Sequence, residues 1–221
     1  MTTISSKNII EPSLSEQRSG LVIVIDDDAD LLQALQALLH AHGLTCLTFA
    51  DARAYIEQVS QFNLAFIGPS CLLCDVQMPG LTGLDLQSQL PASASRPMIL
   101  MSGASSNAEV VAAFRGGAFD FILKPFESAQ LLAVIDKALA CSAEALAADH
   151  NSQIIQQKIA TLTTREREVL KSVAAGLLNR EIAEQLGVGI RTVKLHRQHG
   201  MEKLGVNKLV DFTALLSQAD L

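Results

Sequence analysis

The sequence has no tryptophan, one tyrosine and only four cysteines in 221 residues. With so few aromatic rings, base-stacking platforms for single-stranded nucleic acid are not expected. Four cysteines in a chain of this length do not make a disulfide scaffold and suit a reducing compartment, so we expect a cytoplasmic protein. No uncharged apolar run approaches the roughly 18 residues of a membrane span, and the first 20 residues lack the apolar stretch of a secretory signal. We therefore expect no membrane partner.

Charge is unevenly distributed along the chain. The net charge is -6, with 49% apolar and 18% charged residues, which is enough apolar side chain for a buried core. Residues 1–157 carry 7 basic and 16 acidic side chains, giving -9, whereas residues 158–221 carry 10 basic and 7 acidic, giving +3. An acidic first part and a basic second part predict two domains with different partners, of which only the second suits a polyanion.

Short apolar runs alternate with helical patterns between residues 20 and 140. The run Leu21–Ile25 shows no polar alternation, which is typical of a strand buried on both faces of a parallel sheet. Further strands are predicted at 44–49, 70–76, 98–102 and 119–123, and helices at 31–39, 52–59, 83–90, 108–115 and 128–139. Five such units predict an α/β fold with a doubly wound five-stranded parallel sheet.

The rest of the chain lacks strand patterns. Residues 1–19 are predicted to be a flexible arm, and residues 141–157, which are rich in Ala and Gln, a helical linker. Four helices are predicted at 164–175, 179–186, 190–204 and 208–218, with glycines between them. Residues 158–221 are therefore expected to form an all-α domain of four helices.

Ionisable side chains follow three of the predicted strands. Asp26 and Asp27 come after the first strand, Asp75 ends the third, and Lys124 follows the fifth. The carboxyl ends of parallel strands meet at one edge, where three carboxylates repel one another unless a cation lies among them. Oxygen ligands with retained water suit Mg²⁺. The set predicts phosphoryl transfer to an aspartate, with metal and Lys124 neutralising the phosphoryl oxygens.

Two further residues fit this chemistry. Ser102 ends the fourth strand and could donate a hydrogen bond to the new phosphate. The Lys124-Pro125 pair is a candidate cis peptide, which would aim the lysine inward.

Four segments carry a family resemblance: 24–28, 74–80, 101–103 and 121–126. In this order and spacing, residues 20–140 resemble the receiver domain of two-component response regulators, a CheY-like fold. The resemblance implies that Asp75 is the phosphoacceptor. It implies Asp27, Asp75 and the backbone carbonyl of Gln77 as Mg²⁺ ligands, with Asp26 acting mainly through water.

The same resemblance implies a conformational switch. Ser102 and Phe121 would form the switch pair, in which the hydroxyl moves onto the phosphate while the ring turns inward. Lys124 would bind the phosphoryl group, which a sensor histidine kinase would supply.

Other interpretations of these residues exist. Taken alone, the three consecutive aspartates are typical of a helix N-cap, and Lys-Pro of a turn. A phosphoaspartate hydrolase commonly has a second carboxylate two residues after the nucleophile, where this chain has Gln77, so we expect no enzyme. An inactive pseudo-receiver would lack an acidic residue or the lysine, and neither is missing. Cys71 and Cys74 lie within one strand and point to opposite faces, so we interpret both as core residues.

The second domain contains a helix-turn-helix pattern. Residues 179–186 and 190–197 flank the turn Gly187–Gly189, and Ile182, Leu186 and Val193 provide the apolar contacts of such a pair. Cations and polar groups crowd the second helix, as a recognition helix requires.

Residues 162–216 resemble the LuxR-type domain of the FixJ/NarL response regulators. The resemblance rests on the motifs at 162–166, 179–183 and 192–196. It places Lys194, Leu195 and Gln198 towards the major groove and makes Arg191, Thr192 and Arg197 candidates for phosphate contacts. Double-stranded promoter DNA and RNA polymerase are the partners that it implies.

Phosphorylation is expected to favour a homodimer. The predicted dimer contacts are Val110, Phe121, Leu209, Phe212 and Leu216. By pattern alone, the apolar residues of the last helix fit a domain core equally well. A DNA-binding protein that does not depend on phosphorylation is the remaining alternative.

Overall fold

The computed structural model describes residues 20–61, 68–103, 106–206 and 212. Its chain divides into two compact units, residues 1–146 and 147–221. The predicted arm at 1–19, the predicted helix at 208–218 except Phe212, and the dimer candidates Leu209 and Leu216 lie outside the described residues.

The first unit contains a five-stranded parallel sheet. Its strands are β1 (Leu21–Ile25), β2 (Thr45–Phe49), β3 (Ser70–Asp75), β4 (Met98–Ser102) and β5 (Asp120–Leu123), in the order β2-β1-β3-β4-β5. The predicted fold class is confirmed, and each strand lies within one residue of its predicted bounds. All residues of β1, β3 and β4 are buried, because helices cover both faces of the sheet.

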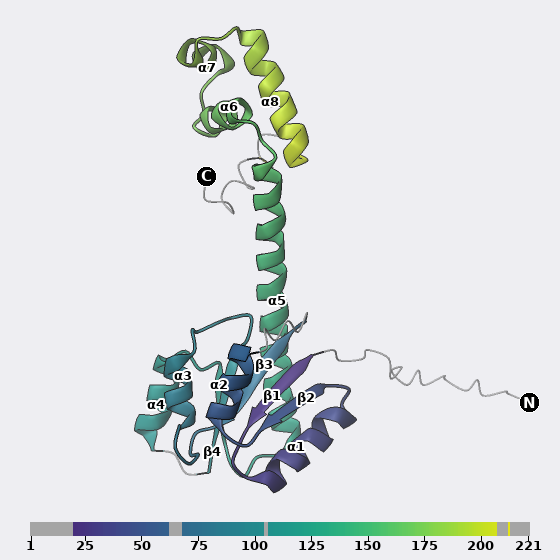
Figure 1. The fold of residues 1–221 in the computed structure, drawn as a ribbon, viewed down its shortest axis with the longest axis vertical. Helices are drawn as coiled ribbons and strands as arrows, with labels where there is room; N and C mark the ends of the chain where they lie inside the picture. The colour runs from purple at the N-terminus through teal and green to yellow at the C-terminus, as the bar shows by residue number, and fades with distance from the viewer. Residues whose placement is uncertain (1–19, 62–67, 104–105, 207–211, 213–221) are drawn as a thin grey trace, which may run out of the picture. The chain divides into compact units, whose positions relative to one another are not determined.

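Two helical layers enclose the sheet (Figure 1). The helices are α1 (Ala29–Ala41), α2 (Ala52–Gln61), α3 (Gly83–Gln89), α4 (Asn107–Arg115) and α5 (Ser128–Ala160). Leu35 and Leu39 of α1 and Leu131 and Ile135 of α5 pack on one face of the sheet. Residues of α2, α3 and α4 pack on the other face, and each layer forms its own hydrophobic cluster.

Side-chain caps fix where three helices begin. Asp28 accepts hydrogen bonds from the N–H groups of Asp30 and Leu31, and Thr82 and Ser106 form capping boxes at α3 and α4. These caps lie at the carboxyl edge of the sheet. The chain therefore leaves β1, β3 and β4 in turns of defined geometry.

Helix α5 covers both the helix predicted at 128–139 and the helical linker predicted at 141–157. The two form one continuous helix over Ser128–Ala160. This stretch contains no glycine or proline that would end the helix. The side chains of residues 147–154 are all exposed, so this part has no core-facing periodicity that would predict its extent.

The second unit contains three described helices after α5: α6 (Thr164–Ala174), α7 (Asn179–Leu186) and α8 (Ile190–Leu204). Gly187 ends α7 in the left-handed conformation with φ 65°, which forms the tight turn of the helix pair. A Cβ at Gly200 would lie 2.8 Å from Leu170, so this glycine allows α8 to pack closely on α6. Phe212 is only 1% exposed and belongs to this core. Its burial favours the core interpretation over the predicted dimer contact.

Across the described residues, no helix combines the length and apolar character of a membrane-spanning segment.

Candidate functional site

The predicted site residues meet at the carboxyl edge of the sheet. Asp75 is the last residue of β3, and Asp26 directly follows β1, the neighbouring strand. On the other side of β3, Asp75 pairs with Met101 of β4, one residue before Ser102. Lys124 follows β5, the next strand.

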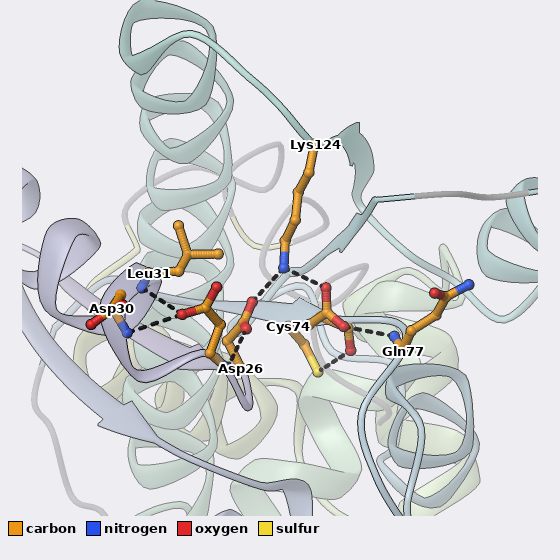
Figure 2. Close-up of polar contacts among 8 residues, drawn as sticks. Asp26, Asp30, Leu31, Cys74, Gln77 and Lys124 are labelled. Atoms are coloured by element: carbon orange, nitrogen blue, oxygen red, sulfur yellow. Dashed lines mark hydrogen bonds and ion pairs between the residues drawn. The ribbon is translucent and has the colours of Figure 1, made fainter.

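Lys124 joins two of the carboxylates (Figure 2). Its Nζ lies 2.6 Å from Oδ2 of Asp26 and 2.6 Å from Oδ1 of Asp75. Burial lowers the pKa of Lys124, but the hydrogen bonds and charges of the two aspartates outweigh burial, and the pKa is raised. The ammonium group is thus a fixed positive charge between two anions. The Lys124-Pro125 peptide bond is cis.

Asp75 is buried, with 4% of its surface exposed. Its Oδ2 accepts a hydrogen bond of 2.7 Å from the N–H of Gln77. Burial raises the pKa of Asp75 above its ordinary value, although Lys124 and the Gln77 N–H act in the opposite direction. This carboxylate is buried, and its charge is only partly compensated.

A close approach positions the turn that follows Asp75. Gly83 begins α3, and its N–H donates to the carbonyl oxygen of Val76 at 3.0 Å. A Cβ at Gly83 would overlap the carbonyl oxygen of Asp75. Only glycine therefore lets α3 start this close to the end of β3, a requirement that the sequence analysis did not identify.

The predicted third carboxylate differs from the other two in exposure. Asp27 is exposed, and no group of three or more His, Cys, Asp or Glu within the described ranges is placed to hold a metal ion. The structure brings Asp26 and Asp75 together through Lys124 instead. The oxygen donors still suit a hard cation, since Mg²⁺ takes one or two carboxylates and keeps several waters.

Ser102 and Phe121 differ in burial. The Ser102 side chain is fully buried, and its Oγ has no hydrogen-bond partner in the described part of the chain. Phe121 is half-buried and packs against the cluster under α2, α3 and α4. The hydroxyl is ready to donate to an acceptor that arrives at the end of the neighbouring β3.

The Cys71–Cys74 pair is not a redox or zinc site. Cys71 packs in the cluster on the α1 and α5 side, whereas Cys74 packs in the opposite one. Burial raises the pKa of Cys71 to about 12 and that of Cys74 still higher. The two thiols therefore serve as core residues, as predicted from their spacing.

Helix α8 exposes most of the predicted DNA contacts. The exposed members of the set are Arg191, Thr192, Lys194, Leu195 and Gln198. Arg197 is half-buried, and its Nη1 lies 3.4 Å from the Asn179 side-chain oxygen of α7, so it also links the two helices. The amide of Gln198 donates to Glu202 one turn further along α8.

Three large apolar side chains of α4 and β5 are exposed, and we call them together the α4–β5 patch. It consists of Val111, Phe114 and Leu123, which are 49%, 49% and 57% exposed. Large apolar side chains at such exposure on a folded domain mark an interaction surface when they cluster. The predicted contacts Val110 of α4 and Phe121 of β5 are half-buried in the same two elements, and the three exposed residues were not among the predicted contacts.

Comparisons with known proteins agree with this geometry. Residues 22–136 match the response regulator receiver domain, and residues 160–216 match the bacterial regulatory proteins of the luxR family. The chain is 34% identical over 201 residues to the transcriptional regulatory protein FixJ of Bradyrhizobium diazoefficiens, covering 90% of this chain and 96% of FixJ. It is 34% identical over 195 residues to the response regulator protein TodT of Pseudomonas putida, covering 88% of this chain and 84% of TodT.

A solved structure supports the same assignment. The response regulator StyR matches with a TM-score of 0.78 and 34% identity, over 90% of this chain and 98% of StyR. These relatives are regulators rather than enzymes, which argues against the hydrolase alternative. The chain belongs to the family of two-component response regulators that join a receiver domain to a LuxR-type DNA-binding domain.

Proposed function

We propose that this response regulator is a promoter-binding transcription factor that is activated when a sensor histidine kinase phosphorylates Asp75. The observation that carries the proposal is the buried Ser102 hydroxyl without a partner among the described residues, on the strand next to Asp75. Leaving such a group unpaired costs about 1–3 kcal/mol. A phosphoryl group on Asp75 supplies an acceptor, so phosphorylation favours the arrangement in which Ser102 reaches it.

The chain's own residues prepare the transfer. The Asp75 carboxylate attacks the phosphorus of the kinase's phosphohistidine, so the new O–P bond forms as the P–N bond breaks and the kinase imidazole leaves. The Lys124 ammonium, already at Asp75, passes to a phosphoryl oxygen. Asp27, Asp75 and the backbone carbonyl of Gln77 would hold Mg²⁺, with Asp26 acting through water. When bound, this ion neutralises the phosphoryl oxygens.

The switch would act on the α4–β5 patch. As Ser102 moves onto the phosphoryl group, Phe121 of β5 turns inward, and the surface beside it changes. The exposed Val111, Phe114 and Leu123 then favour pairing with a second copy. Two LuxR-type domains would read promoter half-sites about one helical turn apart and recruit RNA polymerase in the cytoplasm. Because this is a population shift, some dimer exists without phosphorylation.

The test is sedimentation velocity of the purified full chain with Mg²⁺, with and without beryllofluoride, which stands in for the phosphoryl group. We expect the wild type to shift from monomer to dimer. Asp75→Asn should not shift, whereas the control Asp149→Asn, an exposed aspartate of α5, should behave as the wild type does. Phe114→Asp should remain monomeric with beryllofluoride, because a charge replaces an apolar contact.

A separate readout distinguishes the switch from the interface. Fluorine NMR reports beryllofluoride bound to Asp75 independently of dimerisation. Ser102→Ala should bind beryllofluoride but dimerise less, and Phe114→Asp should bind it normally. If Asp75→Asn binds promoter DNA and dimerises as the wild type does, the protein is a phosphorylation-independent DNA binder.

A further inference from the structure

A pocket lies far from the proposed phosphorylation site, at the amino ends of β3 and β4. It has a volume of about 330 Å³. Leu72 and Met98 form part of its wall, three residues before Asp75 and four residues before Ser102. At about 3.3 Å per strand residue, the pocket lies about 10–13 Å from the carboxyl edge.

Much of the lining is apolar. Tyr55 of α2 and Leu90, which follows α3, line it together with Leu72 and Met98. After α4, the lining consists of Gly116 and Gly117, which have no side chains. Small-molecule sites are concave and mainly apolar, with a few placed polar groups, and start at about 300 Å³. In size and lining, the pocket suits the body of a small organic molecule.

One cation faces this lining. Arg96 is half-buried, and the one hydrogen bond of its guanidinium among the described residues is a long one of 3.4 Å from Nε to the Ser70 hydroxyl. The described lining residues include no aspartate or glutamate. An anionic partner would stabilise an uncompensated guanidinium beside an apolar surface. The charge of the pocket therefore favours an anionic ligand.

We propose that this pocket binds a small organic anion with an apolar body. The carboxylate or similar group pairs with Arg96, and the body packs against Tyr55, Leu72 and Met98. Neither contact involves Asp75, so binding in this pocket does not depend on phosphorylation.

Two hydrogen-bonded links connect the pocket to the rest of the unit. The Gln87 amide, which lines it, donates to the Ala113 carbonyl of α4 at 2.9 Å. The carbonyl of Ser95, also in the lining, accepts from the buried Ser142 hydroxyl of α5 at 2.6 Å. A ligand in the pocket would therefore contact residues that are bonded directly to α4 and α5.

The test is a titration of the unphosphorylated full chain with naphthoate, followed by calorimetry and by amide NMR shifts. We expect saturable binding at one site, with shifts concentrated around Leu72, Arg96 and Gly117. Arg96→Gln should weaken binding about tenfold or more, because a charge-assisted hydrogen bond is lost. The control Arg53→Gln, an exposed arginine outside the pocket, should leave the affinity unchanged.

Two further measurements separate the pocket from general charge attraction. Ala92→Phe places bulk at an exposed lining position and should abolish binding while the protein remains folded. The neutral naphthamide should bind the wild type about tenfold more weakly than naphthoate does, and Arg96→Gln should not weaken it further. Absence of binding at millimolar naphthoate, or equal losses in Arg96→Gln and Arg53→Gln, would overturn the proposal.

Discussion

Asp75 is kept in surroundings that disfavour its charge. It is buried, and Lys124 divides its own charge between this aspartate and Asp26. The raised pKa means that the folded protein stabilises the protonated carboxyl more than the unfolded chain does. Ionised Asp75 therefore costs stability at neutral pH, as is common for groups that are retained for their reactivity.

We expect Asp75→Asn to raise the free energy of unfolding at pH 7 by about 1 kcal/mol. Because the folded-state pKa is raised, the stability of the wild type is fully retained below the ordinary value of 3.8 and declines as pH rises through the folded value. The advantage of Asp75→Asn should thus widen as pH rises from about 4 through the raised folded-state pKa of Asp75. Urea unfolding, followed by the NMR signals of the sheet, measures this difference in the free energy of unfolding, with Asp149→Asn as control. A constant difference across this range would contradict the argument.

A second residue of note is Leu178, which occupies the N-cap of α7. It is 69% exposed and has no side-chain oxygen to accept the free N–H groups of the first turn. Only half of a capping box is present, since the Leu178 N–H donates to the Glu181 carboxylate at 2.7 Å. The caps at Ser106 and Thr163 have both halves.

Leu178→Ser should stabilise α7 by about 1 kcal/mol, because a hydroxyl at this position caps the helix and little apolar burial is lost. Slower hydrogen exchange of the α7 amides would report the gain. Leu178→Ala, which removes the leucine without adding a cap, separates the two contributions. Equal protection in the serine and alanine variants would show that capping is not limiting.

At the scale of elements, α6 and α8 are joined by a charge pair at the end of their packed interface. Glu166 lies 2.7 Å from Lys203 and also accepts from the N–H of Thr163. The hydrogen bond from Lys203 lowers the pKa of Glu166 to about 2. Because this pKa is depressed, the pair contributes fully above the unfolded pKa near 4.5 and loses its contribution as pH falls towards 2.

Glu166→Gln should lower the free energy of unfolding at pH 7 by about 1 kcal/mol, near the upper end for partly exposed ion pairs. The amide oxygen of the glutamine can still accept the hydrogen bond from the Thr163 N–H. The cost should shrink as pH falls below about 4.5. NMR-monitored urea unfolding of the second unit measures both, and a cycle with Lys203→Met isolates the pair. If the loss persists unchanged when Lys203 is already methionine, the charge pair is not its cause.

The long helix α5 is stabilised unevenly. Leu131, Ile135 and Ala138 are buried against the sheet and Ile159 in the second core, but the side chains of 147–154 are exposed. A helix without tertiary packing depends on its own backbone hydrogen bonds, which are marginal over so few residues. The middle of α5 is therefore the least protected part of a continuous helix.

Native-state hydrogen exchange should show this directly. Amides of 147–154 should exchange at least tenfold faster than those of 131–139, because local opening of the middle exposes no buried side chain. Ala148→Gly should accelerate exchange there further while leaving 131–139 unchanged. Uniform protection along α5 would mean that another part of the chain stabilises the middle.

How far the sequence predicts each element depends on burial. The strands were predicted to within one residue because a continuous apolar run such as Leu21–Ile25 has few alternatives in a parallel sheet. Residues 141–157 were predicted as a helical linker, but the exposed middle of α5 shows no periodicity that would indicate one continuous helix with 128–139. In the site, strand order explains why Asp26, Asp75 and Lys124 meet, as predicted, but not that Asp27 is exposed and completes no metal-holding group among the described residues.

At the scale of the whole molecule, charge limits how DNA can be bound. The first 157 residues carry -9 and the remainder +3, so a polyanion meets favourable charge only on the second unit. Within that unit, Arg191 and Lys194 are exposed on α8, whereas Arg197 also contacts Asn179. With so few cations available per chain, pairing two chains is the direct way to strengthen phosphate contacts.

Two exposed residues of α8 should have distinct roles in DNA binding. Arg191 is a proposed phosphate contact and Gln198 a proposed base contact. In a dimer, Arg191→Gln removes two phosphate contacts and should reduce the slope of log affinity against log salt by about 2, weakening selected and random duplexes alike. Gln198→Ala should leave the slope unchanged and lower the preference for the selected duplex, by about tenfold for one base contact per half-site. Fluorescence anisotropy across salt concentrations, with a duplex selected from genomic fragments and a random one of equal length, measures both. If Gln198→Ala changes the slope while Arg191→Gln changes only the preference, the two roles are reversed, and α8 enters the groove in a different orientation.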